Sequence, residues 1–320
     1  MRHFKNTVFW FIALIAIGGA FFLTDDRVKE AERVEKVNLL LVSYDIESIT
    51  EFSISSAEEG VRAHGAKEKD GWWLVEPLRA KGDDKAIGDM LRNIIESRKD
   101  AVLFENPEPS KLAELGLDVP ELEITFKTAN SATTIVFGHQ GPTLNITYAM
   151  FKGDPRVYRI HSDVRTEADT TVYALRDKLI FEIDPLQLSR LEIDRRGKDT
   201  VEIVHDRGRW DMIEPDMARA SQIKVLELLY TVKDTPAKAF IDESPKDLAL
   251  YGLDEPRITL TVMEKGKKEP YTLLIGDRDR ANRGYFAKNK GTKNVVALEE
   301  IVVKSLLAGS DTWKELDEGV

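Results

Sequence analysis

A long internal repeat constrains the fold of this chain more than any other feature of its sequence. The stretch GWWLVEP ends at Pro77 and returns as GRWDMIEP, which ends at Pro215, 138 residues later. The stretch LAELGLDVP ends at Pro120 and returns as LALYGLDEP, which ends at Pro256. The offset stays at 138 or 139 residues over most of the repeat, with a two-residue deletion before the GLD motif and a compensating insertion after it. Similarity at a fixed period predicts two copies of one structural unit.

The repeat begins before these motifs, because residues 39–54 parallel residues 178–193. The first unit is therefore expected to span residues 39–177 and the second residues 178–317. A length of 320 residues also fits two domains. The pattern leaves open whether the units fold separately or share one continuous sheet.

Both units show the same order of predicted elements. Each unit begins with strands in which apolar and polar residues alternate, followed by a strand that contains tryptophan and then an amphipathic helix. A short turn ending at Gly116 or Gly252 comes next, and four strands and a closing helix complete the unit. The apolar face of the first amphipathic helix comprises Ile87, Met90, Leu91, Ile94 and Ile95, and that of the second comprises Ile223, Leu226, Leu229, Tyr230 and Val232. The four strands are expected near 121–128, 132–138, 145–151 and 156–160, and near 257–264, 270–275, 284–288 and 294–298, with closing helices near 162–177 and 299–308. This order predicts an α+β protein: two tandem repeats of a mainly antiparallel sheet with packed helices.

An apolar segment precedes the repeats. No residue from Val8 to Leu23 is charged, Arg2 and Lys5 precede the segment, and Asp25 follows it. A stretch of this length is close to the short limit for a helix that spans a bilayer. The distribution of charge places the N-terminus in the cytoplasm. We therefore expect residues 1–24 to form a cytoplasmic tip and a single-pass transmembrane anchor in the inner membrane, with a periplasmic body.

Two further readings concern this N-terminal region. The small residues Gly18 and Ala20 also fit a signal peptide that is cleaved after Ala20, although the apolar run continues beyond that point. Residues 25–38 combine apolar positions three apart with charged residues, and this spacing predicts a juxtamembrane helical stalk.

Composition excludes several classes of function. The chain has no cysteine, so it has no disulfide, no thiolate metal site and no lipidated cysteine anchor. Its formal net charge is −10, which disfavours binding to nucleic acid. No glycine-rich phosphate-binding loop is present, and no two of the five histidines have helical ligand spacing. We therefore expect no cofactor, no metal and no enzymatic activity.

The acidic pair Asp83 and Asp84 has two interpretations. Both residues open the amphipathic helix, where carboxylates cap free backbone N–H groups and favour the positive end of the helix dipole. A calcium site or an acid/base pair is the alternative. We expect capping.

Positions that differ between the copies are the better candidates for function. Trp72 aligns with Trp210 and is expected in the core, whereas Trp73 aligns with Asp211 and points to the opposite face of its strand. His139 aligns with Asp277, which opens a charged loop. The candidate contact surface therefore comprises Trp73, His139, Asp277, Arg278, Asp279, Arg280, Asn282 and Arg283.

The repeated motifs resemble the domain-of-unknown-function 4340 family. The resemblance rests on the GWWLVEP strand, the GLD-x-P turn, the short strand ending in glycine and the strand with an aromatic residue before alanine, and it covers residues 39–317 twice over. It implies one N-terminal membrane helix, an extracytoplasmic body and an association with gliding-type ABC transport components. It carries over no catalytic residue.

Three functions remain open from the sequence. The first is a non-enzymatic accessory protein that contacts membrane subunits resembling those of an ABC transporter. The second is an extracytoplasmic module that binds a polysaccharide or another ligand through Trp73 and the polar loops. The third is a hydrolase with a site assembled from separate acidic residues. The partner, the ligand and the oligomeric state are not specified by the sequence.

Overall fold

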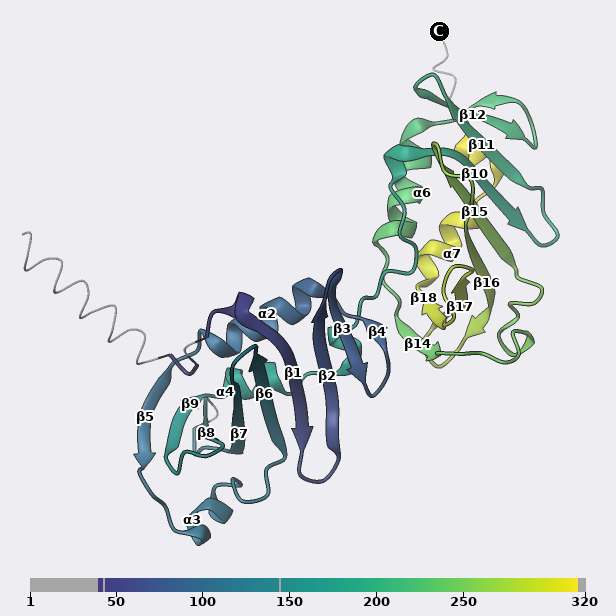
Figure 1. Cartoon of the computed structure of the whole chain (residues 1–320). Helices are drawn as coiled ribbons and strands as arrows, with labels where there is room; N and C mark the ends of the chain where they lie inside the picture. The colour runs from purple at the N-terminus through teal and green to yellow at the C-terminus, as the bar shows by residue number, and fades with distance from the viewer. Residues whose placement is uncertain (1–39, 43, 144, 316–320) are drawn as a thin grey trace, which may run out of the picture. The chain divides into compact units, whose positions relative to one another are not determined.

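The computed structural model describes residues 40–315 apart from positions 43 and 144, and the chain divides into two compact units between Asp177 and Lys178 (Figure 1). The predicted anchor and stalk lie outside the described residues. Within the part of the chain that is described, no helix is long and apolar enough to cross a membrane.

Unit 1 is a nine-stranded antiparallel sheet with helices. Its strands are β1 (Ile49–Ser56), β2 (Gly60–Glu68), β3 (Gly71–Glu76), β4 (Ala80–Lys81), β5 (Lys99–Phe104), β6 (Leu122–Thr128), β7 (Ala132–Gln140), β8 (Ile146–Phe151) and β9 (Val157–His161). Its helices are α2 (Asp84–Ile95), α3 (Pro109–Glu114), α4 (Ser162–Ala168) and α5 (Val172–Leu175), with a 3-10 turn η1 (Ile46–Ser48). The strand order is β4-β3-β2-β1-β6-β7-β8-β9-β5.

Unit 2 repeats this architecture with its own nine-stranded antiparallel sheet. Its strands are β10 (Leu188–Arg195), β11 (Val201–Asp206), β12 (Arg209–Glu214), β13 (Ala218–Arg219), β14 (Ala239–Asp242), β15 (Ile258–Glu264), β16 (Tyr271–Asp279), β17 (Gly284–Asn289) and β18 (Val295–Leu298). Its helical elements are α6 (Gln222–Asp234), α7 (Glu300–Leu306), and the 3-10 turns η2 (Pro185–Gln187), η3 (Ala249–Tyr251) and η4 (Ser310–Trp313). The strand order, β13-β12-β11-β10-β15-β16-β17-β18-β14, is that of unit 1.

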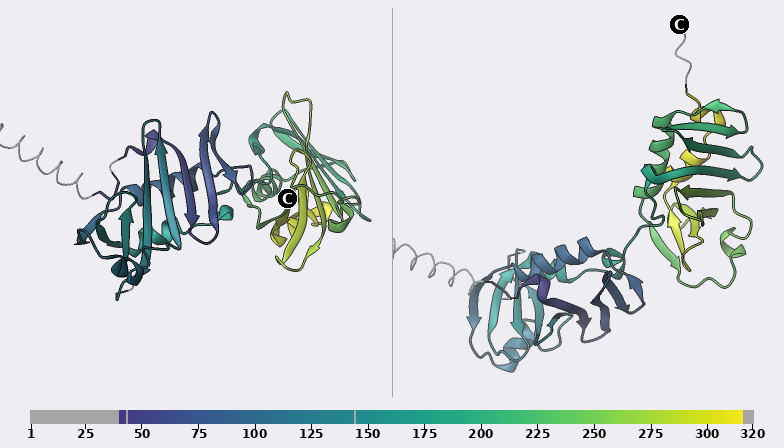
Figure 2. Two further views of the ribbon diagram at one scale, coloured as in Figure 1. Left: turned by 60° about the horizontal axis from the view of Figure 1, so that its bottom comes forward. Right: turned by 45° about the horizontal axis from the view of Figure 1, so that its top comes forward.

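These observations confirm the expected α+β class and the two tandem repeats. The two units do not share one sheet, since each sheet takes all of its strands from its own unit. The strands of each unit lie side by side as one twisted sheet (Figure 2).

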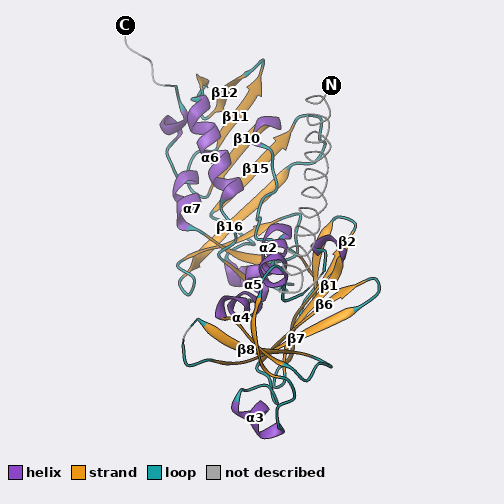
Figure 3. Cartoon of the chain, turned by 90° about the vertical axis from the view of Figure 1, so that its left-hand side faces the viewer, coloured by secondary structure: helices purple, strands orange, loops and turns teal. Residues whose placement is uncertain are grey.

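The helices pack on one face of each sheet and enclose the main core. In unit 1, α2 packs against α4 and α5, and in unit 2, α6 packs against α7. Figure 3 shows α6 and α7 along the same face of the unit 2 sheet. Trp72 and Trp210 are both buried in these cores, as their repetition predicts.

The two long helices bury equivalent residues. Helix α2 buries all five predicted positions. Helix α6 buries Val225, Leu228, Leu229 and Val232, which lie 138 positions after Ile87, Met90, Leu91 and Ile94. The sequence-based face of α6 was therefore partly wrong: Ile223 and Tyr230 are exposed. Its sequence is apolar on more than one face, so periodicity alone does not identify the buried one.

Other predicted elements also needed correction. The closing stretch 162–177 forms two short helices, α4 and α5, in place of one. The edge strands β5 and β14 were not predicted; each pairs with the last strand of its unit.

A second, smaller core lies on the opposite face of each sheet and is closed by the GLD turn. Gly116 and Gly252 have left-handed backbone conformations, with φ of 71° and 63°. The backbone N–H of Leu117 donates to the carbonyl of Leu112 at 2.9 Å, a bond that closes the C-terminus of a helix. The predicted glycine cap is confirmed, and Leu115 and Leu117 beside it are buried against Val136 of β7 and Val157 of β9.

Candidate functional site

Trp73 lies on β3, on the face of the sheet opposite to the main core. Its indole Nε1 donates to Asp70 Oδ1 at 3.0 Å, and the guanidinium of Arg79 lies 4.7 Å from its ring centroid. Arg79 also pairs with Glu68 at 2.9 Å. The hydrogen bond from Trp73 lowers the pKa of the Asp70 carboxyl. The half-buried ring is therefore held among charged side chains at the surface.

The same place in unit 2 has different chemistry. Asp211 occupies the position of Trp73 and pairs with Arg209 at 2.9 Å. Met217 occupies the position of Arg79 and is 88% exposed. The stacked aromatic ring and arginine are a property of unit 1 alone.

His139 and Asp277 occupy equivalent places beside the GLD turns. The backbone N–H of His139 donates to the carbonyl of Leu115 at 2.8 Å, and its ring lies against Gly116. Asp277 pairs with Arg257 at 3.1 Å. Both side chains are exposed. Trp73 and His139 lie on strands separated by three others in the sheet order, so they do not form a common site within unit 1.

The charged stretch that begins at Asp277 was expected to be a loop, but its first three residues form the end of β16, and residues 280–283 form the turn to β17. Asp279 is buried and accepts hydrogen bonds from the backbone N–H groups of Ala281 and Asn282 and, at 2.6 Å, from the Asn282 side chain. This network fixes the turn, so Asp279 and Asn282 are primarily folding residues.

Three arginines lie at the end of β16 and in the turn that follows it. Arg278 pairs with Glu300 at 3.7 Å. Arg280 and Arg283 are exposed, and Arg283 has a positive φ of 52°.

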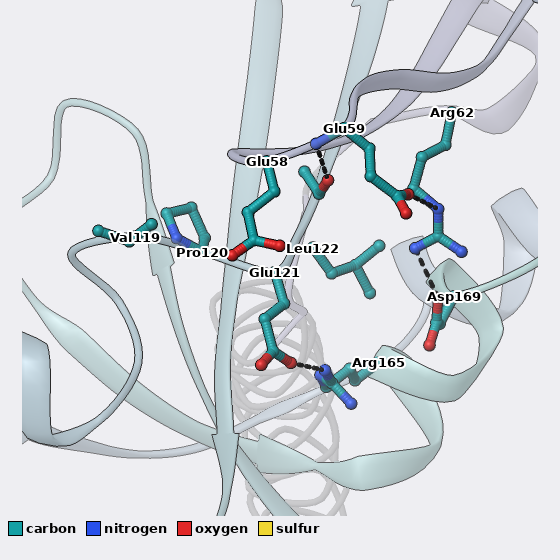
Figure 4. A pocket seen from close by; sticks show the side chains of 10 residues that line it. Glu58, Glu59, Arg62, Val119, Pro120, Glu121, Leu122, Arg165 and Asp169 are labelled. Atoms are coloured by element: carbon teal, nitrogen blue, oxygen red, sulfur yellow. Dashed lines mark hydrogen bonds and ion pairs between the residues drawn. The ribbon is translucent and has the colours of Figure 1, made fainter.

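Sequence reasoning missed a polar pocket of about 390 Å³ in unit 1 (Figure 4). The turn between β1 and β2, the start of β6 and helix α4 surround it. Arg62 pairs with Asp169 at 2.8 Å, and Arg165 pairs with Glu121 at 3.1 Å. The Nε atom of Arg165 is buried and has no hydrogen-bond partner within the described structure.

One exchange between the repeats places a buried arginine in unit 2 at the position of a pocket-lining residue of unit 1. Ser56 lines the pocket in unit 1, and Arg195 occupies the equivalent position in unit 2. Arg195 is 3% exposed; it donates to the carbonyl of Ala308 after α7 and to that of Asp199 at 2.7 Å. Burial lowers the pKa of this guanidinium. The presence of serine in one copy and arginine in the other at this position was the one sequence feature that could have indicated the pocket.

The helices differ in what they present to solvent. In unit 2, Ile223 and Tyr230 of α6 are 69% and 39% exposed, and Ile301 of α7 is 58% exposed. The equivalent residues of unit 1 are charged: Lys85, Arg92 and Asp163. Large exposed apolar side chains of unit 1 lie outside α2 and α4, at Val61, Val102, Val119 and Tyr173.

The described residues contain no group of three or more histidine, aspartate or glutamate side chains that is arranged to hold a metal ion.

Two copies of one α+β unit, each with its own sheet and core, define a tandem-repeat protein. The family model described as domain of unknown function (DUF4340) matches residues 72–221 and 210–317. Both matches begin at the equivalent tryptophans, Trp72 and Trp210. The chain belongs to the DUF4340 family. No curated protein and no solved structure matches it.

Proposed function

We propose that this protein is a non-enzymatic accessory protein whose body is held on the extracytoplasmic side of the inner membrane by residues 1–24. In this proposal, the duplicated body contacts membrane subunits that resemble those of a gliding-type ABC transporter. In this proposal, unit 2 carries the surface that contacts these subunits, and unit 1 connects unit 2 to the membrane anchor.

The observation that carries the proposal is the exchange of charged for apolar residues on the helices of unit 2. The core of unit 1 forms with charged residues at these positions, so folding of the repeat does not require Ile223, Tyr230 or Ile301 to be apolar. Exposed apolar side chains that gather on one layer are typical of protein contact surfaces.

To test the proposed contact with membrane subunits, exposed apolar residues of unit 2 are replaced by the residues that unit 1 has at the equivalent positions. The full chain is purified from gently solubilised membranes, and the associated membrane proteins are identified. We expect transporter-like subunits with the native chain and their loss with I301D/L307D, which places the unit 1 residues Asp163 and Asp169 at the equivalent positions. The matched control, V119E, carries the unit 2 residue Glu255 into unit 1 and should retain them. Recovery of the native chain alone would contradict the proposal.

The membrane topology is tested separately. Because the chain has no cysteine, Met217→Cys introduces a single reactive thiol at a highly exposed position. We expect a membrane-impermeant maleimide to label this variant in cells whose outer barrier is removed and whose cytoplasmic membrane is intact. Labelling only after the cytoplasmic membrane is opened would place the body in the cytoplasm.

A second candidate function is supported by the polar pocket and by Trp73. The unpartnered Nε of Arg165 requires an acceptor, and a hydroxyl or carboxylate of a polysaccharide supplies one. Titration with uronic acid oligosaccharides tests this candidate. If the native chain binds these oligosaccharides and R165M or W73A does not, ligand recognition would be favoured over the accessory role. If the native chain does not bind them, this second candidate function would be excluded.

A further inference from the structure

Helix α6 carries a second apolar stripe that does not contribute to its own core. Ile223, Leu226 and Tyr230 have the spacing i, i+3 and i+7, which places them along one side of the helix. Ile223 and Tyr230 are exposed and Leu226 is partly exposed. The buried residues of α6 occupy the other side, so the stripe points away from the sheet.

Comparison with unit 1 shows that this stripe is not a requirement of the fold. The equivalent positions on α2 are Lys85, Gly88 and Arg92, and α2 packs on its sheet through the same four buried positions as α6. Unit 2 therefore exposes apolar surface at positions where unit 1 has two cations and a glycine. An apolar stripe of this kind usually packs against another apolar surface.

We propose that the α6 stripe docks against the same stripe of a second copy of this chain, in an antiparallel helix pair that forms a twofold-symmetric dimer. A twofold interface requires one surface to be complementary to itself. An antiparallel pair centred between Leu226 and Glu227 places Ile223 of one copy opposite Tyr230 of the other and brings the two Leu226 residues together.

The charges that flank the stripe are complementary in the same arrangement. Lys224 and Glu227 lie together on one side of the stripe, and their side chains pair at 3.2 Å. An antiparallel pair brings Lys224 of each copy next to Glu227 of the other, which adds two intermolecular pairs. In a parallel twofold pair, the Lys224 and Glu227 sides of the two copies would lie on opposite sides of the interface, so these intermolecular pairs would not form.

The net charges of the two units also favour self-association through unit 2. Residues 178–317 contain 24 basic and 26 acidic residues, a net charge of −2, whereas residues 39–177 contain 16 and 24, a net charge of −8. Two copies of unit 2 therefore repel one another less than two copies of unit 1. This argument favours a second copy as the occupant.

The inference rests on the proposed role of unit 2 as a contact unit. It assigns the stripe on α6 to a second copy and leaves α7 to the membrane partner. The two assignments are tested by different variants, so either can fail alone.

The decisive experiment uses single cysteines in the full, otherwise cysteine-free chain, purified in mild detergent. Leu226→Cys places one thiol near the proposed twofold axis, and Gly88→Cys places one at the equivalent position of unit 1. Copper phenanthroline oxidises two adjacent thiols to a disulfide. We expect a covalent dimer from L226C and only monomer from G88C.

A second pair of substitutions separates contact from folding. I223K/Y230R converts the stripe to the residues of unit 1, and unit 1 folds with them. In the L226C background it should abolish the covalent dimer, and without the cysteine it should weaken association in sedimentation by about tenfold or more. A native chain that sediments as a monomer, together with L226C that forms no disulfide, would overturn the proposal. A disulfide between L226C and a different protein in membranes would also overturn it, because the occupant would then be that partner.

Discussion

Two adjacent tryptophans of β3 have opposite environments, and this difference sets the first prediction at the residue scale. Trp72 is buried against Phe52, with ring centroids 5.5 Å apart, whereas Trp73 is half-buried beneath Arg79. We expect W72A to lower the free energy of unfolding by about 3–5 kcal/mol. W73A should cost about 1 kcal/mol, because it removes a surface stacking contact and one hydrogen bond. Urea denaturation measures both, and equal losses would show that Trp73 is a core residue.

The carboxylate of Asp154 gives a prediction about acid stability. Hydrogen bonds from Arg156 hold the pKa of Asp154 at about 2, below its ordinary value of 3.8. A carboxylate with a lowered pKa in the folded state stabilises the fold above its ordinary pKa, and this contribution disappears as pH falls through the folded-state value. The pair is near the surface, so D154N should cost about 1 kcal/mol at neutral pH. Denaturation at several pH values should show the difference vanish between pH 3.8 and about 2; a constant difference would exclude an ionic contribution.

At the scale of single elements, the close approach of the GLD turn to its strand is the feature most sensitive to substitution. A methyl group on Gly138 or Gly276 would overlap the carbonyl oxygen of Leu115 or Tyr251. We expect G276A to destabilise unit 2 by about 1–3 kcal/mol, since the backbone of the turn must move. The control is G88A on α2, where the added methyl meets no neighbour within 4 Å. It should stabilise the helix by about 0.5–1 kcal/mol. Thermal melts of both variants check the signs, and a neutral G276A would contradict the packing argument.

The elements also show what local sequence pattern predicts and what it does not. The repeat is visible because its motifs return at a fixed offset, and the face of α2 and the glycine caps follow from residue spacing and backbone preference within a few residues. Strands β5 and β14 were missed because their pairing with β9 and β18 joins residues more than 50 positions apart, and it depends on the assembled sheet. The buried Arg195 could not be assigned from its own neighbours, since its hydrogen bonds reach the end of α7. It is visible only by comparison with Ser56.

At the scale of the whole molecule, the cores are separate. The buried apolar clusters that contain Trp72 and Trp210 each draw all of their residues from one unit. A domain with its own core can unfold without its neighbour. We therefore expect W210A to increase amide hydrogen exchange in peptides from residues 188–313 and to leave exchange in peptides from residues 49–175 unchanged. W72A should give the reverse pattern.

Mass spectrometry of exchanged peptides measures both effects in one sample of the full chain. The equivalent positions of the two tryptophans make each variant the control for the other, because both remove the same side chain from the same strand of the repeat. If either substitution raised exchange equally in both units, the units would be thermodynamically coupled. Surface changes in unit 2, such as I223K/Y230R, would then also alter unit 1, and the repeats could not be assigned separate roles on the basis of single substitutions.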